Sequence, residues 1–519
     1  MKRLYLWIKI IPMESLDVVV IGSGIGGLVA AGLLTRYGRR VLVCESHTLP
    51  GGAAHAFQRQ GFTFDSGPSF YCGLADPTSC NPLREVLNAL GEKVNTVAYD
   101  PLGHYHFPER TLAIYGDAKR YQASLAEFNP QAAQELQALT DKMLAIYRPL
   151  GSIPALALRA DGWLFPLLAQ RFPTAMLQML PQLRSLGRSM GDFVDETVHD
   201  PWLRQLIDLE CFLLSGMKSH ETVAPEMAFM FGERAASVID YPMGGSGALV
   251  DALIRGFKRW GGELRLGTHV SKIWTDRNQA QGVILKNGER IRADKVISNA
   301  TLWDTYNHLL DDTDLPMGYR QKSLETPAVD SFMHLHLGIQ AEGLDDLTVH
   351  HVVVHDTDTD ITTPGNTCMI SIPSVLDPTL APEGHHVVHA YTLEPWQDWQ
   401  WDAGYGAKKE ARAKPLIRAL QKVIPDICDR ITLKLIGTPL THQRFLRRHQ
   451  GTYGPAIAAG QGLFPSCKTP IKGLYRVGDS TIPGIGVPAV AASGILCANS
   501  LVSPRESAAL LDLQRSKST

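Results

Sequence analysis

The stretch Asp17 to Leu34, DVVVIGSGIGGLVAAGLL, decides the fold. Val18 to Ile21 form an apolar run, which predicts a parallel strand buried on both faces. Gly22, Gly24 and Gly27 follow in the spacing G-x-G-x-x-G, and an apolar helix begins within them. The first glycine allows a sharp turn, the second a close approach to a pyrophosphate, and the third close packing of helix on strand. Because the helix N-terminus also offers free N–H groups to phosphates, the stretch predicts a dinucleotide site rather than a structural glycine turn.

A second strand with an acidic end follows the glycines. Arg40 to Cys44 predict this strand, and Glu45 comes directly after it. An acidic side chain about 20 residues past the glycines is the usual ligand of the ribose hydroxyls. A second glycine pair, Gly51 and Gly52, lies too near the first cluster to serve another dinucleotide. We therefore expect it to wrap around the same extended ligand.

Size and charge exclude several classes of protein. A chain of 519 residues is too long for one core, so we expect more than one domain. The net charge of −2 gives no electrostatic case for nucleic acid as a partner. The 8 cysteines include no C-x-x-C pair, which argues against a disulfide scaffold or structural zinc and favours a reducing, intracellular compartment.

Two segments could contact a membrane surface. Neither can span a bilayer, because no uncharged apolar run reaches the roughly 18–20 residues that a spanning helix needs. Residues 1–13 are basic and apolar, and form either an extension, with Met13 as a second possible start, or a small surface anchor. Residues 152–190 are rich in Leu, Trp and Phe, broken by prolines and punctuated by arginines. They form either short helices closing a core or a monotopic membrane patch that admits a lipophilic substrate. The arginines are Arg159, Arg171, Arg184 and Arg188.

Residues 45–69 carry the pattern E-x-x-x-x-PGG-x-x-x-x-x-x-x-x-GF-x-FD-x-GPS. This pattern resembles the FAD site of the phytoene desaturase and carotenoid isomerase family, within the wider amine-oxidase-like flavoproteins. The resemblance implies FAD as cofactor. Ala53 stands where many members have an arginine that contacts the pyrophosphate. This departure resembles the isomerase-like branch more than the bacterial desaturases, and it removes one source of charge compensation.

Two later segments extend the resemblance. G-x-x-V-x-x-I over residues 267–273 implies that the backbone of Val270 contacts the adenine. After a strand at Leu474 to Val477, the resemblance implies that Asp479, behind Gly478, meets the ribityl or phosphate end of FAD. It also places Gly486 and Val487 beside the flavin ring, where the positive end of a helix dipole stabilises the negative charge of reduced flavin. The site residues expected to bind the cofactor are thus Gly22, Gly24, Gly27, Glu45, Gly51, Gly52, Val270, Gly478, Asp479, Gly486 and Val487.

The implied fold class is α/β, with a Rossmann-type FAD-binding domain of the glutathione-reductase kind and an inserted α+β substrate domain. One complete dinucleotide fingerprint favours a single long FAD over FAD with a second, nicotinamide cofactor. The expected FAD-binding domain comprises residues 16–80, 236–300 and 441–502, and the substrate and membrane-association domain residues 81–235 and 301–440. Residues 1–15 form the extension, and residues 503–519 a polar, frayed tail.

Histidines recur on the predicted strands of the substrate domain. His334 and His336 share one strand face, and His351 and His355 share another. Clusters of this kind can bind a metal. We predict no metal site, because no carboxylate stands at a ligand-like spacing beside either pair.

A flavin would carry the chemistry, with the protein supplying orientation and burial. The middle of the chain offers apolar and aromatic residues rather than a charged anchor, which suits a polyene. The resemblance, over residues 16–500, implies a carotenoid drawn from a membrane, in a plastid or thylakoid-type membrane if the source is photosynthetic. The GGAAH variant and the C-terminal motif favour a carotenoid cis–trans isomerase-like enzyme.

Other functions remain open at this stage. With the same chemistry, the chain could be a polyene desaturase or a saturase of the retinol saturase kind. A flavin amine oxidase acting on a soluble amine would need a carboxylate or an aromatic cage near the flavin, and a non-enzymatic FAD scaffold is a further class. No catalytic acid or base is assigned, since nothing in the sequence gives the direction of His442, Arg444 or Tyr453. The oligomeric state is open too.

Overall fold

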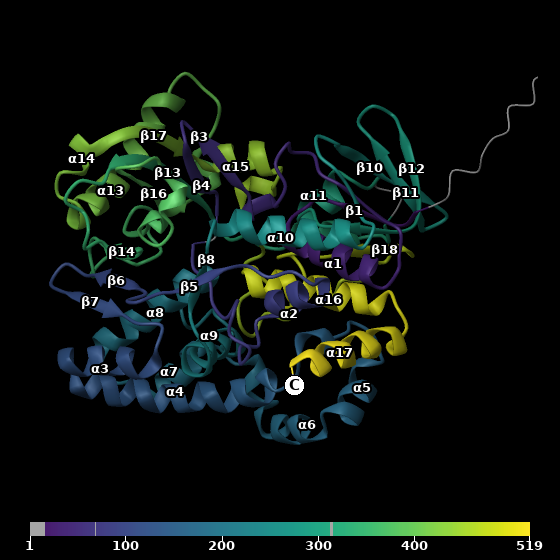
Figure 1. Ribbon diagram of the computed structural model, residues 1–519, viewed down its shortest axis with the longest axis horizontal. Coiled ribbons are helices and arrows are strands. Elements are labelled where there is room, and N and C mark those ends of the chain that lie inside the picture. Colours follow the sequence, from purple (N-terminus) through teal and green to yellow (C-terminus); the bar gives the residue numbers. More distant parts are fainter. Residues whose placement is uncertain (1–15, 68, 312–314, 519) are drawn as a thin grey trace, which may run out of the picture.

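A computed structural model describes residues 16–67, 69–311 and 315–518. Residues 1–13, for which an extension or an anchor was expected, lie outside the described residues. The helices and strands fall around two seven-stranded sheets. Figure 1 shows the two sheets in separate parts of the molecule, with helices around both.

The first sheet forms around the opening stretch, as predicted. It is parallel from β9 through β2, β1 and β12 to β18, while β10, β11 and β12 form antiparallel hairpins. Its strands are β10 (Val270–Asp276), β11 (Gln279–Leu285), β12 (Arg290–Ser298), β1 (Leu16–Ile21), β2 (Val41–Cys44), β9 (Glu263–Arg265) and β18 (Leu474–Arg476). Strands from three distant segments of the chain therefore meet at one sheet, and Cys44 ends β2 directly before Glu45.

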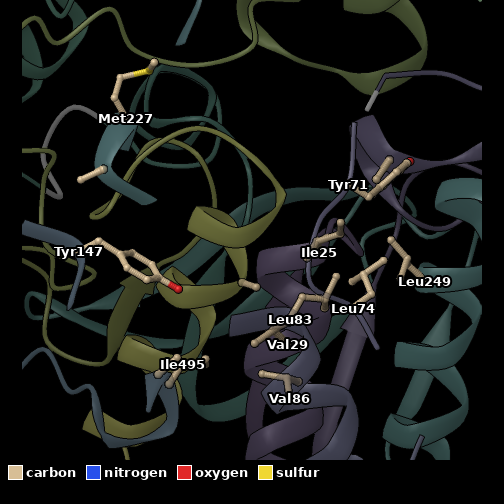
Figure 2. Packing of buried hydrophobic residues seen from close by; sticks show 14 of the residues in the cluster. Ile25, Val29, Tyr71, Leu74, Leu83, Val86, Tyr147, Met227, Leu249 and Ile495 are labelled. Atoms are coloured by element: carbon tan, nitrogen blue, oxygen red, sulfur yellow. The ribbon is translucent and has the colours of Figure 1, made fainter. Parts of the chain in front are cut away.

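Four helices pack beside the first sheet: α1 (Ile25–Arg36), α2 (Pro82–Leu90), α10 (Gly245–Arg259) and α16 (Val487–Ser500). Glycines make the close approaches possible. A Cβ on Gly32 of α1 would lie 2.9 Å from the Leu90 side chain, and one on Gly494 of α16 would lie 2.7 Å from the carbonyl oxygen of Gly26. Figure 2 shows Ile25 and Val29 of α1 packed near Leu83 and Val86 of α2. Helix α2 thus packs on the nucleotide-binding side, although its residues follow the boundary expected at residue 80.

The second sheet is mixed and runs in the order β17-β13-β16-β15-β14-β6-β7. The strands expected at residues 330–340, 349–356 and 385–392 are confirmed within it. Helix α13 (Tyr405–Val423) packs on this sheet over a separate hydrophobic cluster. The strands are β17 (Ile431–Gly437), β13 (Ser331–Gln340), β16 (His385–Glu394), β15 (Thr367–Ser371), β14 (His350–Val354), β6 (Gly103–His106) and β7 (Thr111–Ile114).

A helical layer lies below the second sheet in Figure 1. It comprises α3 (Ala118–Phe128), α4 (Pro130–Gly151), α7 (Met190–Thr197), α8 (Pro201–Ser215) and α9 (Ala224–Ala236). Helix α4 begins where its sequence favours a start: the Asn129 side chain accepts a hydrogen bond from the Ala132 N–H, and Pro130 holds the first position. In residues 152–190 the chain forms the short helices α5 (Leu164–Arg171) and α6 (Pro173–Met179), followed by 3₁₀ turns.

The remaining elements are shorter and connect these layers. They are β3 (Ala56–Arg59), β4 (Phe62–Asp65), β5 (Thr96–Ala98), β8 (Asp240–Pro242), α11 (Leu302–Asn307), α12 (Tyr319–Leu324), α14 (Ile427–Arg430), α15 (Pro439–Leu446) and α17 (Pro504–Ser518). Within the described residues, no helix is both long and apolar enough to cross a bilayer.

The prediction of a frayed tail after residue 503 is wrong. The segment forms α17, whose Leu510 and Leu511 are buried. Arg159, one of the four arginines of the segment for which a core and a membrane patch were both considered, is buried, pairs with Asp161 and donates to the hydroxyl of Ser507 in α17. The polar composition concealed this docking, because only a few apolar side chains, Leu510 and Leu511 above all, hold the helix against the core.

Candidate functional site

A large cavity lies between the two sheets, with a volume of about 1180 Å³. This exceeds the roughly 300–1,000 Å³ of a pocket for one drug-sized ligand, so the cavity can take a ligand larger than that. Ten of the eleven residues expected to bind the cofactor line it: Gly22, Gly24, Glu45, Gly51, Gly52, Val270, Gly478, Asp479, Gly486 and Val487. The structure therefore brings together all four distant segments that the sequence singled out.

The eleventh residue, Gly27, lies behind the cavity wall. A Cβ there would lie 2.5 Å from the carbonyl oxygen of Gly22. This is the packing position that the glycine spacing predicted, since only glycine lets α1 approach β1 so closely. Gly27 shapes the turn and does not line the cavity.

The two glycine clusters touch each other. Gly24 and Gly51 form a parallel bridge, and the Gly51 N–H donates to the carbonyl of Ser23. Gly51 has φ +111°, and a Cβ on Gly52 would lie 3.1 Å from the Cα of Gly24. Backbone without side chains thus lines this end of the cavity, which leaves the close approach that a pyrophosphate needs.

Glu45 is held in place by three donors. One of its carboxylate oxygens accepts from the Ser23 N–H and hydroxyl, each at 2.8 Å, and the other accepts from the His47 N–H at 2.8 Å. The side chain is 8% exposed. Three of the four lone-pair directions of the carboxylate are therefore used, and the fourth, on the oxygen that accepts from His47, is free for a ribose hydroxyl.

Asn299 is a site residue that the sequence analysis missed. It follows β12, and its N–H donates to the carbonyl of Ile21 at the end of β1. Its side chain lies among the glycines: a Cβ on Gly24 would be 2.6 Å from its amide nitrogen, and one on Gly478 would be 2.8 Å from its amide oxygen. The sequence feature that could have identified it is a polar residue directly after a buried parallel strand, because ligands bind at the carboxyl ends of the strands in such sheets.

The C-terminal segment lines the cavity with a helix N-terminus. Gly486 precedes α16 with φ +101°, and nothing lies within 4 Å of where its Cβ would be. The Asp479 carboxylate forms an ion pair with Arg448 at 2.5 Å. Residues 487–490, the first turn of α16, line the cavity. Free N–H groups at this helix N-terminus can stabilise negative charge there.

The end of α15 and the two residues after it, 443–448, line the nucleotide end of the cavity and supply positive charge there. Arg444 and Arg447 line the cavity, and neither forms a hydrogen bond or ion pair with another described residue. The charge of Arg447 adds to burial in lowering the pKa of His269, the neighbour of Val270. Both arginines can therefore supply the positive charge that Ala53 does not.

The other end of the cavity is mainly apolar and aromatic. Helices α8 and α9 form one wall, with Phe212, Leu213, Phe229 and Met230 among the lining residues. The second sheet and the loop after α15 contribute Phe332, Met369, Tyr391 and Tyr453. This wall suits a long apolar ligand. Tyr453, whose direction the sequence left open, faces the cavity, and burial raises its pKa well above the ordinary value.

The histidines of the second sheet are buried behind this wall. His334 and His336 are joined by His389 and His442 in a stack of rings, and His334 Nδ1 lies 2.8 Å from His389 Nε2. Burial lowers the pKa of all four, so they are neutral near pH 7. Ligand atoms of the first three lie within 4.8 Å of one another, but the His336 and His389 rings are only 6° from parallel, whereas metal ligation needs lone pairs that converge.

The second predicted histidine pair is arranged differently. His351 contacts His106 at 3.1 Å, while His355 lies near the backbone carbonyl of Pro415. The sequence could not show this partner, because His106 belongs to the distant strand β6.

Comparison with known proteins agrees with this geometry. The family model described as flavin containing amine oxidoreductase matches residues 25–502. Prolycopene isomerase 1, chloroplastic, from an Oncidium hybrid cultivar is 36% identical over 502 residues, covering 95% of this chain and 84% of the relative. The lycopene-forming phytoene desaturase of Pantoea ananas is 27% identical over 507 residues, covering 91% and 96%.

Among solved structures, an oxidoreductase from Methanosarcina mazei has a TM-score of 0.63 at 20% identity, covering 93% of this chain and 99% of that one. At this identity the likeness shows the fold alone, which is the predicted α/β fold with its dinucleotide-binding sheet. The isomerase and desaturase match nearly the whole chain, and the family model spans both ends of the cavity. The protein is therefore an FAD-dependent enzyme and belongs to the flavin-containing amine oxidoreductase family.

Proposed function

We propose that this enzyme is a carotenoid cis–trans isomerase that uses FAD. The observation that carries the proposal is the single cavity, which joins a glycine-lined nucleotide end to a long apolar and aromatic end. The relatives named prolycopene isomerases are 35–36% identical to this chain, against 25–28% for those named phytoene desaturases. A polyene has no charged anchor and gains affinity from apolar burial, which this wall provides.

The proposed cofactor contacts follow the cavity from end to end. The backbone of Val270 lies at the adenine, Glu45 accepts from the ribose, and the loops with Gly24 and Gly52 approach the pyrophosphate. Asp479 meets the ribityl or phosphate end, and Gly486 and Val487 lie beside the flavin ring. When bound, reduced FAD supplies the electron density that lets a conjugated double bond rotate, and α16 directs its positive dipole end toward it. We also propose that the division into an FAD-binding and a substrate domain holds as predicted from the sequence, with α2 moved to the FAD-binding side.

The first prediction concerns the product. With poly-cis lycopene in detergent micelles and chemically reduced FAD, the holoenzyme should change the isomer composition without changing the mass. Chromatography and mass spectrometry measure both quantities. A loss of two hydrogens would instead identify a desaturase and a gain of two a saturase, and an unchanged isomer profile would contradict the proposal.

The second candidate function is that of a flavin amine oxidase acting on a soluble amine. Tyr391 and Tyr453 line the cavity, and aromatic rings can hold an ammonium group against their faces. Amine oxidation releases hydrogen peroxide when oxygen is the acceptor, so a peroxidase-coupled assay with putrescine and benzylamine separates the two functions. The isomerase proposal expects no peroxide above that of the buffer control.

We propose further that the enzyme binds a membrane surface, without spanning it, to collect its substrate. Five large apolar side chains near α5 and α6 are more than half exposed: Trp163, Phe165, Leu177, Leu180 and Leu183. A group of exposed apolar side chains of this size marks an interaction site. Arg184 is exposed beside it, and a basic group next to apolar short helices favours an anionic bilayer. A plastid or thylakoid-type membrane is the expected location if the source is photosynthetic.

The second prediction tests this surface. Replacing Trp163, Phe165 and Leu177 together by serine should lower binding to vesicles of phosphatidylcholine and phosphatidylglycerol by at least tenfold, since burial of each side chain contributes roughly 1.5–3 kcal/mol. Co-sedimentation measures the bound fraction. Trp401→Ser is the control, because Trp401 is 60% exposed and lies outside the patch. An equal loss in both variants would contradict a specific surface.

A further inference from the structure

Six carboxylates line the cavity, and five of them have partners in the protein. Glu45 accepts from Ser23 and His47, Glu210 pairs with Arg234, and Asp479 pairs with Arg448. The other two with partners are Glu233, which accepts from Ser79 and Tyr147, and Asp304, which accepts from the His449 N–H. The carboxylates of these five residues therefore already have hydrogen-bond or ion-pair partners within the protein.

Glu226 is the sixth. Its side chain lines the cavity from the first turn of α9 and forms no hydrogen bond or ion pair with any described residue. Phe229 and Met230, one turn further along the same helix face, are apolar. Burial alone raises the pKa of Glu226 to about 7. An acidic group that faces ligand space without a partner costs free energy in the free protein, and a ligand atom can recover that cost.

We infer that Glu226 holds a hydroxyl group at one end of the polyene, so that the preferred substrate is a polyene alcohol rather than a pure hydrocarbon. This rests on the proposed function and narrows its substrate class. A hydroxyl suits the site because the O–H can donate to the carboxyl whether or not the acid is ionised. The apolar remainder of the ligand then lies along Phe229, Met230 and the opposite aromatic wall.

The composition of the middle of the chain predicted no charged anchor for the substrate, whereas Glu226 places an acidic side chain in the cavity lining. Glu226 and Glu233 lie two turns apart on α9, so the sequence presents them as similar. Only the fold shows that Glu233 contacts Ser79 and Tyr147 from distant segments while Glu226 does not.

The third prediction compares two ligands on the holoenzyme. Poly-cis lycopene and the same polyene bearing one terminal hydroxyl group are titrated in detergent micelles, with quenching of flavin fluorescence as the readout. The wild type should bind the alcohol about tenfold more tightly, the effect of one hydrogen bond of about 1.4 kcal/mol. Glu226→Leu should remove the preference while binding the hydrocarbon at least as tightly, and Glu226→Gln should keep part of it.

Glu221→Gln is the matched control, since Glu221 is exposed on the loop just before α9 and outside the cavity lining. Flavin content and the melting temperature confirm that each variant is folded. Equal affinity for both ligands in the wild type, a preference that survives Glu226→Leu, or tighter binding of an amine than of the alcohol would each overturn the inference.

Isomerisation of both polyenes, followed in parallel, separates the inference from the proposed function. If lycopene isomerises and no end-group preference is found, the inference fails and the isomerase stands. If the alcohol is preferred but gains or loses two hydrogens, the inference stands and the isomerase fails. If neither polyene binds, both fail.

Discussion

Glu45→Ala should weaken the retention of FAD. The substitution removes the carboxylate proposed to accept from the ribose, and a hydrogen bond to a charged group contributes roughly 1.5–3 kcal/mol, so FAD affinity should fall by about 10–100-fold. It also leaves the Ser23 N–H, the Ser23 hydroxyl and the His47 N–H without their acceptor. We expect the apoprotein to lose about 3 kcal/mol of unfolding free energy as well, since an unsatisfied buried donor costs roughly 1–3 kcal/mol.

Two measurements separate these effects. Flavin absorbance against protein concentration gives the retained cofactor, and urea denaturation of the apoprotein gives stability. Glu263→Gln is the control, because Glu263 lies on the adjacent strand β9, is exposed and pairs only with Arg265 among the described residues. It should change stability by less than about 0.5 kcal/mol. Full flavin occupancy in folded Glu45→Ala protein would contradict the ribose role.

Gly27→Ala should destabilise the whole nucleotide-binding sheet. The new Cβ would lie 2.5 Å from the carbonyl oxygen of Gly22 and 3.0 Å from the amide nitrogen of Asn299. The clashing atom of Gly22 is a backbone oxygen, which cannot rotate away as a side chain could. Helix α1 must therefore move away from β1, or the turn between them must open. Overpacking of this kind costs roughly 1–3 kcal/mol or more, so we expect a loss of at least 2 kcal/mol and lower flavin content.

The same substitution elsewhere shows that the effect is local. Gly406 lies in α13 with open space where its Cβ would be. Gly406→Ala should leave stability unchanged or raise it by up to about 1 kcal/mol, since alanine is the better helix former. Thermal unfolding of both variants checks the pair. If Gly27→Ala were as stable as wild type, the close packing of α1 on β1 would not be required.

The sequence was most informative where the constraint is on the backbone. Glycine spacing, an apolar strand and an acidic residue at the next strand end are local features, and Gly24, Glu45, Gly51 and Gly486 all line the cavity as expected. Asn299 was missed, because a single asparagine after a strand has no spacing pattern. Its position matters only once β12 lies beside β1.

The sequence by itself determined the dinucleotide-binding fold, because hydrogen-bonding geometry and close approach impose glycine at particular positions within a short segment. Tertiary structure alone decided which polar groups have partners. It paired Arg159 with Asp161, joined His334 to His389 and left Glu226 facing the cavity without a partner. The physical reason is that a side chain's hydrogen bonds and pKa depend on the segments that surround it, and those segments lie far apart in the chain.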